Sequence, residues 1–219
     1  MSRGEETPGE TPGQTGQTTP ARYPGLSMLQ DLDATLAALL DSELSVENVA
    51  VSFAAPDDQF PPSTVSLPAV AFFLYDVREN FDLRGGRWEV ERADGGFVRS
   101  RPPVRVDCSY LITAWASESA PDPAADEHRL LGEVMKVLLR HRTIPEAYLR
   151  GELVGQEPPL PAKIIGEAQL QSLGELWQAM GGRPKATLNY AVTVSVDVGE
   201  PVPVGPAVTD KVLKLSRKE

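Results

Sequence analysis

Cysteine and histidine are scarce in this sequence, and long apolar runs are absent. Its 219 residues include a single cysteine, Cys108, which has no second thiol to pair with, so the fold needs no oxidising compartment. No apolar run reaches the roughly 18 residues that a membrane-spanning helix requires. Residues 1–20 also lack the apolar core of a secretory signal. These absences predict a cytoplasmic protein that does not contact a membrane.

Signatures of catalysis and of metal binding are also missing. The two histidines, His128 and His141, lie on one predicted helix and its end, where a rotation of 100° per residue points them in different directions. No second His or Cys stands at ligand spacing, and no glycine-rich phosphate loop or Gly-x-Ser-x-Gly motif occurs. Cys108 falls on the apolar side of a predicted strand, where a small core residue is typical. We therefore expect no enzyme, no cofactor and no metal, and an unrecognised catalytic site is the alternative.

The acidic and basic residues are unevenly distributed. The net charge of −10 argues against nucleic-acid binding, which needs clustered Lys and Arg. Residues 26–48 hold five acids and no base, whereas residues 78–105 hold seven arginines against five acids. Such opposed patches suit neighbouring subunits of a ring, and two solvated faces are the alternative. Arginine supplies 15 of the 21 basic residues, which is typical of protein interfaces but also of a GC-rich genome.

Apolar periodicity predicts three helices. The first follows a cap at Ser27, the second begins at Asp122, and the third covers residues 172–182 with a capping box from Ser172 to Glu175. The predicted core stripe of the first helix is Leu29, Leu32, Leu36 and Leu39. That of the second helix is Leu130, Leu131, Val134, Met135, Leu138 and Leu139.

Strand patterns alternate with these helices. Residues 49–53, 69–75, 104–116, 162–167 and 188–198 read as strands, and the two longest ones are natural partners. The segment "RWEVERADGGFVRSR" predicts a hairpin around Asp-Gly-Gly, and its thin apolar side suggests an Arg-rich arm that projects from the body. The order of elements predicts a single α+β domain with a mixed, mostly antiparallel sheet and about three helices.

Segments rich in Gly and Pro flank this domain. Residues 1–25 consist mainly of Gly, Pro, Thr, Glu and Gln and are expected to be a disordered tail. Residues 199–219 are expected to form an extended C-terminal tail, either disordered or lying along a neighbouring subunit. The predicted domain therefore covers residues 26–198.

Several stretches together carry a family resemblance. "LYDVREN" at residues 74–80, "YLITAWA" at 110–116, "EHRLLG" at 127–132 and the step at 177–184 before the long final strand occur in this order. Over residues 26–198 the sequence resembles the tail-terminator, or cap, proteins of extracellular contractile injection systems. These are phage-tail-like particles of the antifeeding-prophage and virulence-cassette type. The resemblance implies a phage tail-terminator-like fold and a structural role.

The resemblance also implies partners. A homohexameric ring would sit on the last layer of inner-tube protein, contact the last ring of sheath protein, stop both from polymerising and hold the sheath extended. The resemblance implies no nucleic-acid partner, no membrane partner and no small-molecule substrate. It also implies assembly in the cytoplasm, into a particle that is either released from the cell or retained in it. Another adaptor of the same particle, at the baseplate or the start of the tube, is the alternative.

Interface residues are predicted within this frame. The segment "DVRENFDLR" would lie where a core strand reaches the subunit boundary, and a ring requires two different complementary patches on each subunit. An ordinary solvated loop is the alternative. The hairpin would reach the tube or the sheath, and the acidic first helix would supply the opposite patch. The predicted interface residues are Asp76, Arg78, Glu79, Asn80, Arg84, Arg87, Arg92, Arg99 and Arg101.

Overall fold

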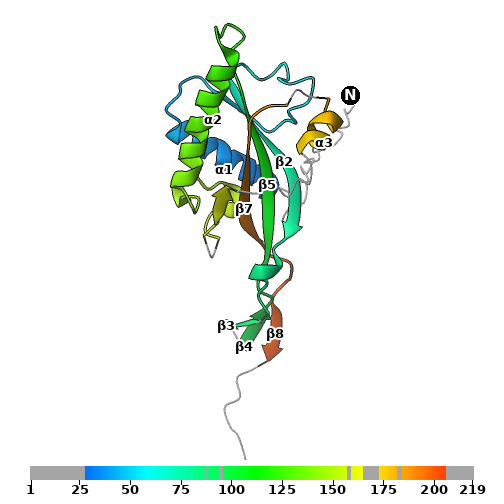
Figure 1. Ribbon diagram of the computed structural model, residues 1–219. Coiled ribbons are helices and arrows are strands. Elements are labelled where there is room, and N and C mark those ends of the chain that lie inside the picture. The colour runs from blue at the N-terminus through cyan, green and yellow to red at the C-terminus, as the bar shows by residue number, and fades with distance from the viewer. Residues whose placement is uncertain are drawn as a thin grey trace, which may run out of the picture.

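A five-stranded sheet and a three-stranded sheet form the framework of the fold (Figure 1). The computed structural model describes residues 28–86, 88–93, 96–156, 159–164, 173–181 and 184–205. The helices are α1 (Met28–Glu43), α2 (Pro123–Arg140) and α3 (Leu173–Ala179), with the 3-10 turns η1 (Phe81–Leu83), η2 (Glu146–Tyr148) and η3 (Gly151–Leu153). The strands are β1 (Ala50–Ser52), β2 (Ala69–Glu79), β3 (Glu89–Ala93), β4 (Gly96–Ser100), β5 (Val104–Trp115), β6 (Ala162–Ile164), β7 (Thr187–Val196) and β8 (Val202–Gly205).

The larger sheet has the strand order β1-β2-β5-β7-β6. Strand β1 pairs with β2 in parallel, and all other pairs of this sheet are antiparallel. The two longest predicted strands are partners, with Val104 opposite Val196 at one end and Thr113 opposite Thr187 at the other. The predicted α+β fold with a mixed, mostly antiparallel sheet and three helices is confirmed.

Strand β2 is longer than its apolar run. The sequence predicts a strand that ends near Tyr75, whereas β2 continues to Glu79 and remains paired with β5. A β-bulge lies at Tyr75, because Leu74 and Asp76 pair with consecutive residues of β5 and leave Tyr75 as the extra one. The chain therefore leaves the core at this point without leaving the sheet, so the expectation of a strand ending there is wrong.

Helices α1 and α2 lie on the same side of the larger sheet (Figure 1). Their apolar faces and one face of β2, β5 and β7 form the main core, and burial of this apolar area provides most of the stabilisation. The largest fully buried side chains include Tyr110, Tyr190, Phe72, Leu32, Leu36, Leu39, Leu40, Leu111 and Ile112. Cys108 is buried in this core as a free thiol, as the sequence predicts.

The helix stripes differ in detail from the predicted ones. Leu29, Met135 and Leu139 were expected in the core but are exposed. In α2 the buried set instead includes Val137, because positions 135 and 139 lie 100° further round the helix than 134 and 138. The predicted cap of α2 at Asp122 is confirmed, since its side chain accepts the Ala125 N–H at 3.1 Å. The predicted caps at Ser27 and Ser172 lie outside the described residues.

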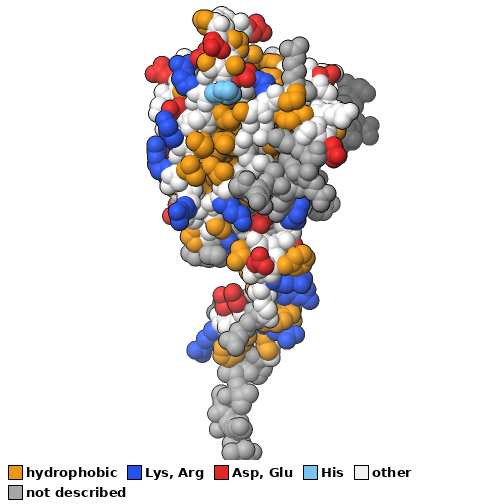
Figure 2. All heavy atoms as spheres, viewed as in Figure 1, with side chains coloured by type: hydrophobic (Ala, Val, Ile, Leu, Met, Phe, Trp, Pro, Cys, Tyr) orange, Lys and Arg blue, Asp and Glu red, His pale blue; other side chains and the backbone are white. Residues whose placement is uncertain are grey.

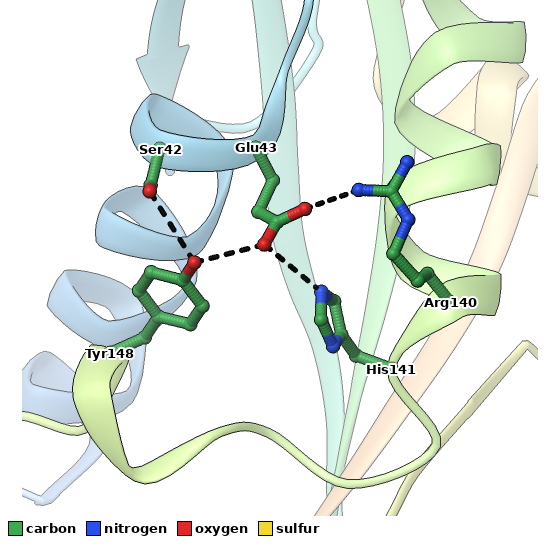
Figure 3. A network of polar contacts seen from close by, with 5 residues as sticks. All are labelled: Ser42, Glu43, Arg140, His141 and Tyr148. Atoms are coloured by element: carbon green, nitrogen blue, oxygen red, sulfur yellow. Dashed lines mark hydrogen bonds and ion pairs between the residues drawn. The ribbon is translucent and has the colours of Figure 1, made fainter.

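A polar network joins the C-terminal ends of α1 and α2 to η2 (Figure 3). The Glu43 carboxylate accepts the Tyr148 hydroxyl at 2.9 Å and pairs with the Arg140 guanidinium. The Nε2 atom of His141 lies 3.5 Å from the same carboxylate, and the Ser42 hydroxyl lies 3.3 Å from that of Tyr148. The hydrogen bond from Tyr148 is the main reason that the pKa of Glu43 is lowered from its usual 4.5.

Replacing Glu43 by glutamine should make stability less sensitive to acid. A carboxyl whose pKa is lower in the folded state contributes stability at pH values above its unfolded pKa, and that stability is lost as the pH falls through the folded value. The wild-type protein should therefore lose more stability below pH 4.5 than the Glu43→Gln variant. Urea unfolding at stepped pH values measures the difference, and parallel pH profiles for the two proteins would contradict this role of Glu43.

Candidate assembly interface

The smaller sheet projects from one end of the molecule (Figure 1). We call this sheet, with the order β3-β4-β8, the arm. Residues 80–86 and 101–103 connect it to the body, and we call them the neck. Strand β8 falls in residues 199–219, which are expected from the sequence to form an extended tail. Its Pro203 gave no strand signal, but an edge strand tolerates proline because one side of its backbone needs no ladder hydrogen bonds.

The predicted interface residues fall into two groups. Asp76, Arg78 and Glu79 are in the last part of β2, and Asn80 and Arg84 flank η1 in the neck. In the arm, Arg92 is on β3, Arg99 is on β4, and Arg101 directly follows β4. Arg87 lies outside the described residues. The fold thus brings the described members of the predicted set to one end of the molecule.

Several of the predicted charges near the end of β2 pair with each other. Arg78 Nε lies 2.6 Å from an Asp76 carboxylate oxygen, and Arg84 Nε lies 3.0 Å from one of Glu79. Both arginines are largely exposed, where such pairs contribute about 0–1 kcal/mol. These four residues therefore present neutralised pairs rather than a strongly charged patch.

Asn80 holds the neck turn in place. Its side-chain oxygen accepts the Leu83 N–H at 3.1 Å, and its Nδ2 atom donates to Asp107 at 3.0 Å. Asp107 also accepts the Thr193 hydroxyl at 2.6 Å. One carboxylate thus ties the neck to β5 and β7, and Asn80 acts as a structural residue of the turn.

Large apolar side chains stand exposed beside these charges. Phe81 is 69% exposed, Leu83 48% and Val77 47%. Sequence reasoning missed them because single apolar residues within a charged segment resemble an ordinary loop. Large apolar side chains exposed within seven residues of the chain suit a surface that another protein covers.

The two faces of the arm differ in charge. Val90 pairs with Arg99 and Arg92 with Phe97, whereas Glu89 pairs with Ser100 and Glu91 with Val98. Opposite residues of paired strands share a face, and alternate residues point to opposite faces. One face therefore carries Trp88, Val90, Arg92, Phe97, Arg99 and Arg101, which we call the arginine face. The other face carries Glu89, Glu91, Val98 and Ser100.

Trp88 is the centre of the arginine face. The guanidinium groups of Arg99 and Arg101 lie 4.7 and 5.3 Å from its ring centroid, within the range of cation–π attraction. Beside Trp88, a hollow of about 230 Å³ separates the neck from the start of β5. Arg84, Gly86, Arg101 and Pro103 are among the residues that line it. Figure 2 shows basic and apolar side chains next to each other along the arm.

The acidic side chains of helix α1 are less available to a partner protein than the sequence suggests. Asp33 accepts the Tyr110 hydroxyl at 2.9 Å, Asp31 accepts the Glu152 N–H at 2.9 Å, and Glu43 belongs to the network of Figure 3. Burial raises the pKa of Asp33, against the effect of the Tyr110 hydrogen bond. Three of the five acids in residues 26–48 thus have partners within the chain, which weakens the expected acidic patch.

Three features bear on catalysis, metal binding and membrane crossing in the described part of the chain. Burial raises the pKa of Cys108 to about 12, so this thiol stays protonated and is a poor nucleophile. Within the described ranges, no group of three His, Cys, Asp or Glu side chains could hold a metal ion. None of the helices there combines the length and the hydrophobicity that crossing a bilayer requires.

Comparisons with solved structures find similar proteins. The chain is similar to the PVC sheath/tube terminator of an extracellular contractile injection system in its extended state, with 26% identity and a TM-score of 0.66 over 87% of this chain. It is similar to the tube-terminating cap of the anti-feeding prophage, with 26% identity and a TM-score of 0.60 over 85% of this chain. The chain covers 64% and 61% of these two proteins, less than two thirds of their length.

The sequence comparisons assign the family. No curated protein sequence matches the chain. The family model of the Pvc16 N-terminal domain matches residues 31–210, which include both sheets and all three helices apart from the first turn of α1. The chain therefore belongs to the Pvc16 N-terminal domain family.

Proposed function

We propose that this protein is a structural cap that terminates the inner tube and the sheath of a contractile injection system. The observation that carries the proposal is the match of residues 31–210 to the family, together with the likeness to two tail terminators at 26% identity. The exposed neck and arm support it, because a terminator acts by covering the surfaces of its partners. The protein performs no reaction in this role.

The proposed assembly is a homohexameric ring at the end of the particle. It contacts the last layers of tube and sheath protein and anchors the extended sheath. A ring uses two different complementary surfaces on each subunit. We assign one of them to the neck and arm, with Asp76, Arg78, Glu79, Asn80, Arg84, Arg87, Arg92, Arg99 and Arg101 in or beside it. The folding unit in this proposal extends beyond residue 198 to include β8.

The length of the particles tests the function. Deleting this reading frame from the operon that encodes the particle should give overlong, ragged or spontaneously contracted sheaths in negative-stain electron microscopy. Supplying the protein in trans should restore uniform, extended particles. Particles of normal length and extension without the protein would refute a cap and favour an adaptor at the baseplate end. A labelled protein at that end would confirm the adaptor.

Acidic substitutions at the neck test the interface. Phe81→Asp combined with Leu83→Asp should change the free energy of unfolding by no more than about 0.5 kcal/mol per site, since both side chains are exposed. The same variant should fail to occupy particle ends, because it places charge where a partner covers apolar surface. Thermal melting and counts of labelled ends measure the two effects. Leu139→Asp, on the exposed side of α2, is the control. An equal loss of occupancy at particle ends in both variants would contradict a specific role of the neck.

A further inference from the structure

Among the described residues, the basic side chains of the arginine face have no acidic partner. Arg78 and Arg84 pair with carboxylates of their own chain. Arg92, Arg99 and Arg101 form no ion pair with any carboxylate in the described part of the chain. The register explains the difference, because the glutamates of β3 point to the opposite face of the arm.

Apolar side chains accompany these arginines. Val90 is 60% exposed and Trp88 is 37% exposed. Val202 of β8 pairs with Arg99 and is also exposed on the arm. A face that combines arginine, tryptophan and valine has the composition of the centre of a protein interface, where Arg and Trp are enriched.

Arg99 and Arg101 bring two positive charges to the same aromatic side chain. Both side chains project from the same side of the strand and approach one indole ring. Like charges held close together repel each other, and an exposed cation–π contact returns only a modest attraction. Both guanidinium groups keep N–H donors that can bind an anion near the ring.

We infer that the arginine face is a receptor for an acidic segment of another polypeptide in the particle. Arg99 and Arg101 bind its carboxylates, and Trp88, Val90 and Val202 cover its apolar side chains. A carboxylate suits these donors because a guanidinium binds it through two parallel hydrogen bonds. This inference rests on the proposed function, and it adds the chemistry of the partner and the face of the arm that binds it.

Carbodiimide coupling tests the inference directly. The reagent adds to a carboxylate and forms an O-acylisourea. A lysine Nζ within contact distance then attacks the activated carbonyl carbon, which forms an amide and releases the reagent as a urea. Arg99→Lys and Arg101→Lys keep the positive charge and place an amine at each position. In purified particles, each variant should give a new crosslink to an Asp or Glu of another chain, identified by mass spectrometry of the joined peptides.

Ser100→Lys is the matched control. It lies between the two test positions but faces the other side of the arm, so it should give no such crosslink. Crosslinks from position 100 that equal those from 99 and 101 would overturn the choice of face. The absence of a crosslink from both 99 and 101 in particles that retain the protein would overturn the inference and leave the cap function intact. Absence of the protein from particle ends would instead overturn the cap function.

Charge reversal provides a second measurement. Arg99→Glu combined with Arg101→Glu should lower occupancy of particle ends about tenfold or more, the effect of losing one or two charge-assisted hydrogen bonds. Arg129→Glu, at an exposed arginine of α2 that pairs with Asp126 of its own chain and lies outside the proposed interface, should have a clearly smaller effect. Unchanged occupancy in the double variant would overturn the inference. A change in tryptophan fluorescence with inorganic phosphate that Trp88→Phe abolishes, without any crosslink to a carboxylate, would show a phosphate site and would also overturn the inference.

Discussion

Replacing Gly151 by alanine is expected to lower the free energy of unfolding by about 2–4 kcal/mol. Gly151 begins η3 with a φ angle of +55°, a conformation that costs an alanine about 1–2 kcal/mol. A Cβ atom there would stand only 2.1 Å from the Asp31 carboxylate. Asp31 has a short side chain that accepts the Glu152 N–H, so it cannot move aside without losing that bond.

Gly155 provides the matched control for this prediction. Its φ angle is +76°, and a Cβ atom there would meet nothing within 4 Å. Gly155→Ala should therefore cost only the backbone strain, about 1–2 kcal/mol. Urea unfolding of the two variants separates the strain from the clash. Equal destabilisation of both variants would show that the Asp31 contact contributes nothing, and that result would contradict the close packing of α1 against η3.

Replacing Asp107 by alanine is expected to have a similarly large effect, about 2–4 kcal/mol. Its carboxylate accepts hydrogen bonds from Asn80 and Thr193, and bonds to a charged group are worth about 1.5–3 kcal/mol each. Burial lowers the pKa of Arg105, and the negative charge of Asp107 partly offsets this decrease. Arg105 is only 6% exposed and forms no ion pair with a described carboxylate, so the loss of the nearby negative charge should add to the cost.

Two milder variants separate these contributions. Thr193→Val removes one hydrogen bond and keeps the shape, which should cost about 1–2 kcal/mol. Asp107→Asn keeps the shape and removes the charge, so it should fall between Thr193→Val and Asp107→Ala. At temperatures where Asp107→Ala is still folded, it should occupy fewer particle ends than Thr193→Val, because Asn80 no longer holds the neck. Normal occupancy would show that the neck keeps its position without Asp107.

Much of the fold could be predicted from local pattern. The 3.6-residue and two-residue periodicities located the helices and the long strands, because burial of one face imposes these periods on the sequence. The pairing of β5 with β7 followed from their matching lengths. Element ends were less predictable. Strand β2 continues past its apolar run because its last residues pair with β5, and hydrogen bonding to a neighbouring strand leaves no apolar signal.

The arginine-rich segment could be recognised in the sequence, and its role as an interface stays a prediction. The described arginines of residues 78–101 lie in the last part of β2, the neck and the arm. Alternation in "RWEVER" and "FVRSR" already separates arginine from glutamate, a signal that could have identified the arginine face. Which charges neutralise each other depends on contacts such as Arg84 with Glu79, and the sequence does not specify these distances.

The sequence by itself determined the α+β class, the helix and strand periodicities, the lone buried thiol and the family resemblance. These properties depend on residue type and on spacing along the chain, which the sequence contains in full. Only the tertiary structure decided that three acids of α1 are bound within the chain, that Phe81 and Leu83 are exposed, and that β8 completes the arm. Each of these depends on residues that are distant in sequence, because a pairing or an exposure is set by what folds against a side chain.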